Sequence, residues 1–199
     1  MNMRIRAVAI ALFSGLLLTA PLAGCSRTPA ETPPLAGARI GGPFTLTDQH
    51  GRTVTDRDFA GRYRIVYFGY TFCPDVCPVD VQNLSAALKL VEAKDPALGR
   101  RIVPIFISVD PARDTPAVLR QFAAAFHPRL VALTGSADAI ARTAKAYGIY
   151  YRRGAGTADG YMVDHSRQIY LFDPDGKPLA LLPEGPPQAI ADELTKWAH

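Results

Sequence analysis

The sequence predicts a single α/β domain in which helices flank a central mixed sheet. Two apolar segments, residues 64–70 and 102–109, are hydrophobic on both alternating faces, which is typical of strands buried on both sides of a sheet. Segments with helical periodicity and N-terminal capping residues follow each of them. This alternation of strands and helices is the pattern of an α/β domain.

The remaining elements can be placed in chain order. Residues 44–46 and 53–54 flank a turn that contains Asp and Gly, so we expect an N-terminal hairpin. Leucine and valine recur at helical spacing after the first buried strand and predict a helix over residues 78–93. Further along we expect a helix over residues 116–126 capped by Thr115, another strand, a helix from Ser136 to about Tyr147, strands over 161–165 and 168–172 with the spacing of a hairpin, and a closing helix over 187–197.

The first 24 residues predict an export signal. Arg4 and Arg6 supply its positive start, and residues 7–20 form an apolar stretch that is short for a bilayer span. Leu-Ala-Gly-Cys at residues 22–25 resembles the lipobox of bacterial lipoproteins, which implies that Cys25 is lipidated. The alternative is an uncleaved anchor helix that extends to Cys25. Both place the domain on the extracytoplasmic, periplasmic side of a bacterial membrane.

Residues 25–42 are predicted to be the lipidated cysteine and a flexible spacer, because they contain three prolines and few large apolar residues. The folded domain is then expected over residues 43–199, which is enough for one core. The formal charge of +4 falls to +2 when the signal is removed, since it holds two arginines and no acid. Without a basic block, the sequence predicts no nucleic-acid partner.

Cys73 and Cys77 follow the first buried strand and are separated by three residues. Pro78 suits the first position of a helix and disfavours helical geometry in the residue before it, so we expect Cys77 at the N-cap. The positive end of the helix dipole would then favour the thiolates. Cysteines at a strand-to-helix junction, followed by two later strands and a final helix, are similar in order to a thioredoxin-like domain.

A turn of this length permits two states of the thiols. Two sulfurs on one metal ion would lie roughly 4 Å apart, whereas a disulfide brings them to about 2 Å. Thiolates select Cu(I) and an imidazole also tolerates Cu(II), so two cysteines with His165 would suit copper. A structural disulfide is the plain alternative, although so short a loop constrains little of the unfolded chain. His165 alone, beside Asp164 and Ser166, is more typical of a structural residue.

Four acidic residues near these elements have structural alternatives. Asp75 would polarise the metal or contact a partner, or it simply suits a turn that contains proline. Asp110 lies at the end of the second buried strand, and this position favours a place beside the metal nearly as much as a role in a turn. Asp80, expected to favour the helix dipole, and Asp114, which precedes Thr115, are predicted to be structural.

A family resemblance rests on three segments, which are Gly69-Tyr70-Thr71-Phe72-Cys73-Pro74-Asp75-Val76-Cys77-Pro78, Ser108-Val109-Asp110-Pro111-Ala112-Arg113-Asp114-Thr115-Pro116 and Val163-Asp164-His165-Ser166. Over residues 43–197 the chain resembles the Sco/SenC family of copper-binding proteins. The resemblance implies a thioredoxin-like fold, copper bound by Cys73, Cys77 and His165, and Asp110 near the metal. It also implies delivery of copper, or control of thiol state, during assembly of the binuclear copper centre of cytochrome c oxidase.

Two functions are consistent with these observations. The first is a metallochaperone that holds one Cu(I) or Cu(II) ion and passes it to the copper-acceptor subunit of cytochrome c oxidase, with other copper chaperones or thiol reductants as further partners. The second is a thiol-disulfide oxidoreductase that reduces the acceptor's cysteines and needs Cys73 and Cys77 but not His165. A peroxidase is a third, and the residues around Cys73 favour it least. We expect a binding protein rather than an enzyme.

Overall fold

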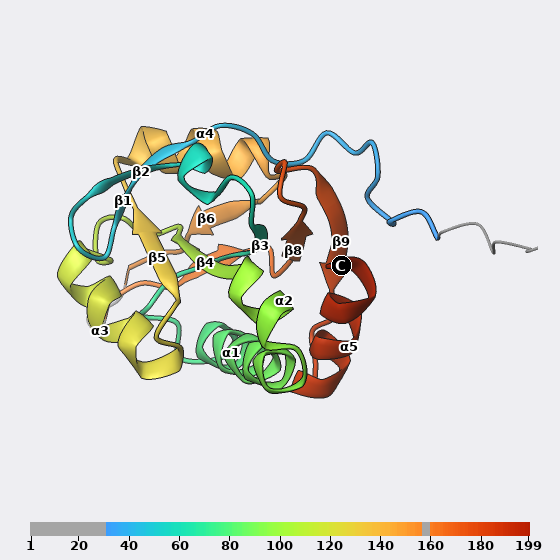
Figure 1. Cartoon of the computed structure of the whole chain (residues 1–199). Helices are drawn as coiled ribbons and strands as arrows, with labels where there is room; N and C mark the ends of the chain where they lie inside the picture. The colour runs from blue at the N-terminus through green and yellow to red at the C-terminus, as the bar shows by residue number, and fades with distance from the viewer. Residues whose placement is uncertain (1–30, 157–159) are drawn as a thin grey trace, which may run out of the picture. The chain divides into compact units, whose positions relative to one another are not determined.

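The computed structural model describes residues 31–156 and 160–199, and the folded unit spans Thr32–His199 (Figure 1). The predicted signal over residues 1–24 and the predicted lipidation site Cys25 lie outside the described residues. Within the part of the chain that is described, no helix is both long and apolar enough to cross a membrane.

A seven-stranded mixed sheet forms the centre, in the order β2-β1-β5-β4-β3-β8-β9. β3 (Tyr63–Gly69) pairs in parallel with β4 (Ile102–Ser108), and β4 pairs in parallel with β5 (Val131–Thr134), whereas β8 (Ile169–Phe172) is antiparallel to β3. Every residue of β3 and β4 is buried, as expected for strands covered on both faces. One side of the sheet ends in the predicted N-terminal hairpin of β1 (Thr45–Asp48) and β2 (Thr53–Thr55), with β2 at the edge. The other edge strand is β9 (Pro178–Leu182).

Helices cover both faces of the sheet. Figure 1 shows α4 above the sheet and the other α-helices below it. The connections β3-α1-β4 and β4-α3-β5 each lead to the neighbouring parallel strand, and both move across the sheet in the same direction. Because such crossovers are right-handed, α1 and α3 lie on the same face of the sheet. The helices are α1 (Val76–Lys94), α2 (Pro96–Arg101), α3 (Pro116–Phe126), α4 (Ala137–Ala146) and α5 (Pro187–Trp197), with a 3-10 turn η1 (Asp56–Phe59).

Two local predictions are wrong. α1 begins at Val76, so Cys77 lies inside its first turn and not at the N-cap. Pro78 is tolerated as the third helical residue because the first four helix amides have no intrahelical partner. The expected hairpin of residues 161–165 with 168–172 also does not form. The fully buried β8 joins the central sheet, while β7 (Val163–His165), with one exposed face, pairs with β6 (Tyr151–Arg153).

The second half of the predicted spacer contacts the domain. The Leu35 amide donates to the Leu179 carbonyl at 2.9 Å, and the Gly41 amide donates to the Ala146 carbonyl at 2.9 Å. Leu35 and Ile40 pack against the core. The chain therefore approaches its domain along β9 and the end of α4, starting several residues before residue 43.

Candidate metal centre

The two cysteines lie where β3 passes into α1. Cys73 is in the connecting loop, and its amide donates to the Tyr70 carbonyl at 3.3 Å. Both thiols are buried, with 8% of Cys73 and none of Cys77 exposed, and they are not joined by a disulfide. The strand end and the first helical turn thus bring both sulfurs to one edge of the sheet, where α/β folds commonly bind ligands.

Gly69, the last residue of β3, makes room for the buried thiol. A Cβ at this position would lie 3.2 Å from the sulfur of Cys77 and 3.0 Å from ring carbons of Tyr67 and Phe106. Contacts of that length require the neighbours to move, and all three side chains are buried in the core. Glycine is therefore needed here for close packing.

His165 faces Cys77 from the end of β7. Its Nε2 lies 3.1 Å from the Cys77 sulfur, and its Nδ1 lies 2.8 Å from the Ser166 carbonyl oxygen. The carbonyl can only accept, so Nδ1 carries the proton and the Nε2 lone pair points at the thiol. The rings of Tyr67 and Tyr70 meet the imidazole edge-on, at 6.3 and 5.9 Å between ring centroids. The imidazole is thus held ready to act as a ligand through Nε2.

Asp80 ties α1 to the segment that follows His165. It is buried and accepts hydrogen bonds from the Tyr67 hydroxyl at 2.9 Å and from Arg167 at 2.9 and 3.2 Å. The expected role in the first helical turn is wrong, because α1 begins at Val76 and Asp80 is its fifth residue, beyond that turn. Asp80 instead joins the cysteine helix to the histidine strand.

Asp114 ties the cysteine loop to the end of β4. Its carboxylate accepts the Thr71 amide at 3.0 Å, the Thr71 hydroxyl at 2.6 Å and the Ser108 hydroxyl at 2.5 Å. Asp114 is fully buried, so these three donors compensate its loss of water. Its structural role agrees with the prediction.

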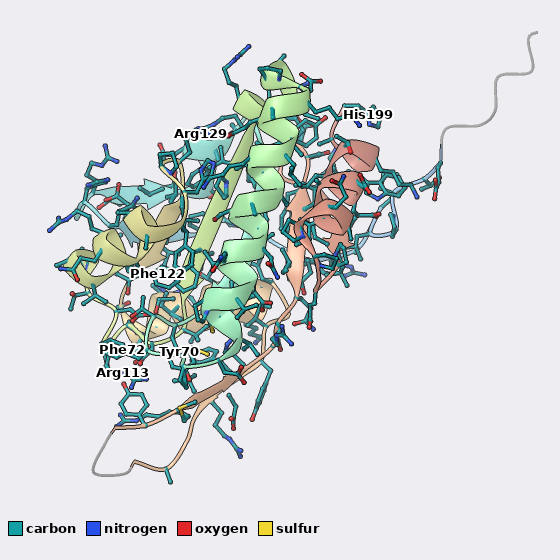
Figure 2. The ribbon with its side chains drawn as sticks, turned by 90° about the horizontal axis from the view of Figure 1, so that it is seen from below. Tyr70, Phe72, Arg113, Phe122, Arg129 and His199 are labelled. Atoms are coloured by element: carbon teal, nitrogen blue, oxygen red, sulfur yellow. The ribbon has the colours of Figure 1, made fainter. Side chains whose placement is uncertain are left out.

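A cluster around Arg113 was not predicted. The guanidinium lies over the rings of Tyr70 and Phe72, at 5.6 and 4.9 Å from their centroids (Figure 2). It also lies 3.7 Å from the ring centroid of Tyr161. Asp110 forms an ion pair with Arg113 and accepts the Tyr161 hydroxyl at 2.7 Å. These contacts link the cysteine loop to the strand of His165. The sequence signal was the position of Arg113 inside a family segment and of Tyr161 four residues before His165.

The two acids proposed to lie beside the metal differ in their surroundings. Asp110 is buried close to the site, but its carboxylate is already bound to Arg113 and Tyr161. Asp75 is exposed at the N-cap position of α1 and its side chain forms no capping hydrogen bond. The Asp75 side chain is therefore open to solvent, whereas the Asp110 carboxylate is held by Arg113 and Tyr161.

The environment makes the two thiols unequal. Burial opposes ionisation of Cys73, but hydrogen bonds from the backbone amides of Cys77 and Asp75 outweigh it and hold the pKa of Cys73 below its ordinary value. Burial raises the pKa of Cys77 to about 12. Burial also lowers the pKa of His165, although the hydrogen bond to the Ser166 carbonyl acts to raise it. Cys73 is thus the readier thiolate, and the imidazole is held neutral as a ligand must be.

The present geometry is close to that of a metal site but tighter. A sulfur and an imidazole nitrogen bound to one metal ion stand roughly 3.6 Å apart, from bond lengths near 2.3 and 2.0 Å. The 3.1 Å between Cys77 and His165 is that of a hydrogen bond. Among residues 31–156 and 160–199, no three His, Cys, Asp or Glu side chains form a ready-made metal cluster. Two sulfurs and an imidazole nitrogen suit a soft metal ion. For the ion to bind, the Cys77 sulfur and the His165 Nε2 must move about half an ångström further apart.

The fold and the site together define a thioredoxin-like domain with two cysteines and one histidine at the end of its central strand. The chain belongs to the SCO1/SenC family, whose profile matches residues 32–199. The family and the thioredoxin-like fold predicted from the sequence are thereby confirmed.

The individual relatives agree with this assignment. Protein SenC of Rhodobacter capsulatus is 47% identical over 139 residues, which are 70% of this chain and 61% of SenC. The copper-bound structure of ScoI from Bradyrhizobium japonicum has a TM-score of 0.72 and 38% identity, and covers 79% of this chain and 99% of ScoI. BsSco, a Sco-family cytochrome c oxidase assembly protein with a disulfide switch, has a TM-score of 0.63 and 26% identity over 83% of this chain and 95% of its own. The chain thus spans about three fifths of the length of SenC.

Proposed function

We propose that the protein is a copper metallochaperone that binds one copper ion through Cys73, Cys77 and His165. The observation that carries this proposal is the 3.1 Å contact between the Cys77 sulfur and the unprotonated Nε2 of His165. A histidine with a purely structural role would not require an unprotonated ring nitrogen that faces a buried thiol. The copper-bound structure of ScoI supports the choice of metal.

The residues suggest an order of events during loading. Cys73 binds the incoming copper first, because its pKa is lowered while that of Cys77 is raised. Cys77 then loses its proton to solvent as it binds the ion, and its hydrogen bond to His165 is broken. Two thiolates hold Cu(I), and the imidazole extends the site to Cu(II). The cargo then passes to the copper-acceptor subunit of cytochrome c oxidase, a destination supported by the similarity to BsSco, a member of the Sco family of cytochrome c oxidase assembly proteins.

Copper titration of the reduced full chain in nonionic detergent tests the ligand set. His165→Ala should weaken copper binding by at least about tenfold, because it removes one ligand of three. His50→Ala is the matched control, since His50 is exposed in the turn between β1 and β2. Equal affinity of the two variants would contradict the proposal.

A second candidate is thiol-disulfide exchange, which the unequal pKa values of the two thiols favour. The Cys73 thiolate would attack an acceptor disulfide, forming a mixed disulfide and releasing one acceptor thiolate. Cys77, deprotonated by solvent base, would then attack the Cys73 sulfur, which releases the second acceptor thiolate. The protein ends as the Cys73–Cys77 disulfide, and both electrons reside on the acceptor's two thiols.

Trapping separates this activity from copper delivery. Metal-free Cys77→Ser should accumulate a mixed disulfide at Cys73 with a disulfide-bonded acceptor peptide, whereas Cys73→Ser should not. His165→Ala should retain exchange and bind copper more weakly. An absence of any mixed disulfide with Cys77→Ser would rule out the reductase.

We also propose that the chain is held on the periplasmic side of a bacterial membrane through a lipid on Cys25. The motif at residues 22–25 supports this attachment. Cys25→Ser should leave the protein soluble after cell fractionation if the signal is cleaved. Retention in the membrane would instead favour the uncleaved anchor helix.

A further inference from the structure

A buried arginine far from the cysteines has one donor atom without a partner. Arg64, the second residue of β3, is only 7% exposed, yet its Nε has no hydrogen-bond partner. No carboxylate among the described residues lies within ion-pair distance of its guanidinium. A buried, charged group without compensation is costly, so this arrangement points to a ligand that supplies negative charge.

The space beside Arg64 is large enough for such a ligand. A cavity of about 420 Å³ is lined by Arg64, Arg57, Asp56 and Tyr147 together with the turn that contains Gly176. This turn fits closely on one side of the guanidinium, because a Cβ on Gly176 would lie 2.8 Å from Nη1 of Arg64. Arg64 is itself among the residues that line this cavity.

Two further arginines make the region positive. A second cavity of about 420 Å³ shares Pro43, Asp56 and Arg57 with the first, and Arg142 of α4 lines it. Two carboxylates also line these cavities: Asp56, which accepts the Phe44 amide at 3.3 Å, and Asp175, which lies 3.7 Å from the Lys177 ammonium. Three arginines against two carboxylates leave the lining with a formal excess of one positive charge. The exposed Arg57 stands between the two cavities and can reach a ligand in either one.

This region lies at the far end of the sheet from the thiols. Arg64 begins β3, whereas Cys73 follows its end, and the neighbouring Tyr63 donates its hydroxyl to the carbonyl of His199. Figure 2 shows His199 at one end of α1 and Tyr70 and Phe72 at the other. Gly42 and Pro43, through which the chain enters the domain, line the cavity.

We propose that Arg64 and Arg57, supported by Arg142, form a binding site for a tetrahedral oxyanion of the phosphate class. Guanidinium groups bind phosphate oxygens through paired N–H donors, and a partly enclosed cavity strengthens that interaction. Both inorganic phosphate and the phosphate of an anionic lipid headgroup have this chemistry. The site is independent of copper binding, because none of its residues contacts the cysteine loop.

The test measures anion binding by the full chain in nonionic detergent, using calorimetry and thermal melting. Inorganic phosphate should bind and raise the melting temperature more than chloride at equal ionic strength. Arg64→Gln and Arg57→Gln should each weaken phosphate binding by about tenfold, as expected for loss of a charge-assisted hydrogen bond. Arg120→Gln, an exposed arginine of α3 outside both cavities, is the matched control and should not change it.

The remaining arms identify the source of the anion. Short-chain phosphatidylglycerol that binds more tightly than inorganic phosphate would assign the site to a lipid headgroup, and the reverse order would assign it to a free oxyanion. Phosphatidylcholine of the same chain length controls for the acyl chains. If Arg64→Gln does not fold, Arg57→Gln decides, because its side chain is exposed. Binding no better than chloride, or equal binding by Arg57→Gln and Arg120→Gln, would overturn the proposal.

Discussion

Replacing Asp80 with Asn should loosen the connection between the two halves of the site. Asp80 accepts one hydrogen bond from Tyr67 and two from Arg167, which lies two residues after His165. Asn keeps the size of the side chain, but one carboxylate oxygen that accepts from Arg167 is replaced by an NH2 group, which cannot accept a hydrogen bond. A hydrogen bond to a charged group contributes about 1.5–3 kcal/mol. Arg167 is 36% exposed, which lowers the cost of losing the pair to about 2 kcal/mol.

Thermal and urea unfolding of the metal-free protein measure this cost. For a domain of this size, 2 kcal/mol corresponds to a fall in melting temperature of about 4–8 °C. Asp192→Asn, an exposed carboxylate on α5, should change stability by less than about 0.5 kcal/mol. The same variants report on the site, because copper should dissociate faster from Asp80→Asn than from Asp192→Asn.

A double-mutant cycle isolates the interaction itself. Asp80→Ala, Arg167→Ala and the double variant should give a coupling free energy of about 1–2 kcal/mol, since the partners share two hydrogen bonds. A coupling below about 0.3 kcal/mol, within the additivity of independent sites, would refute the view that this pair joins the cysteine helix to the histidine strand.

Three other predictions concern packing, pH and the Arg113 cluster. Gly69→Ala should lower stability by about 1–3 kcal/mol, because its Cβ would overlap the Cys77 sulfur, and urea unfolding checks this. Burial lowers the pKa of His127, so the unfolded chain takes up a proton more readily than the folded one; stability should fall as the pH drops below about 6.5, and less steeply in His127→Asn. A slope that is identical in both proteins would contradict this reasoning. Tyr161→Phe removes the hydrogen bond to Asp110 and should speed copper release without changing the fold, as stopped-flow and circular dichroism would show.

The sequence predicted the elements whose signals are local. The buried strands β3 and β4 follow from continuous apolar runs, and α3 begins after Thr115 as its cap and proline indicate. The start of α1 was misplaced because Pro78 satisfies the rules for more than one position in a first helical turn. The pairing of β7 depends on β6, whose three residues carry no strand pattern of their own.

The candidate site was also predictable only where its signals are local in the sequence. Cys73 and Cys77 are recognised by spacing, and His165 only by the family resemblance. Contacts between distant segments, such as Arg113 on Tyr161 or Arg167 on Asp80, have no periodic signal. The unpartnered Nε of Arg64 also has no sequence signal, because Arg64 is simply a polar residue at the start of an apolar strand.

X-ray absorption of the copper-loaded protein tests the central claim most directly. Two sulfur ligands and the multiple-scattering pattern of one imidazole are expected for the wild-type chain. His165→Ala should lose the imidazole pattern and keep both sulfurs, while His50→Ala should match the wild type. A wild-type spectrum with fewer than two sulfurs, or one that His165→Ala leaves unchanged, would contradict a copper centre formed by Cys73, Cys77 and His165.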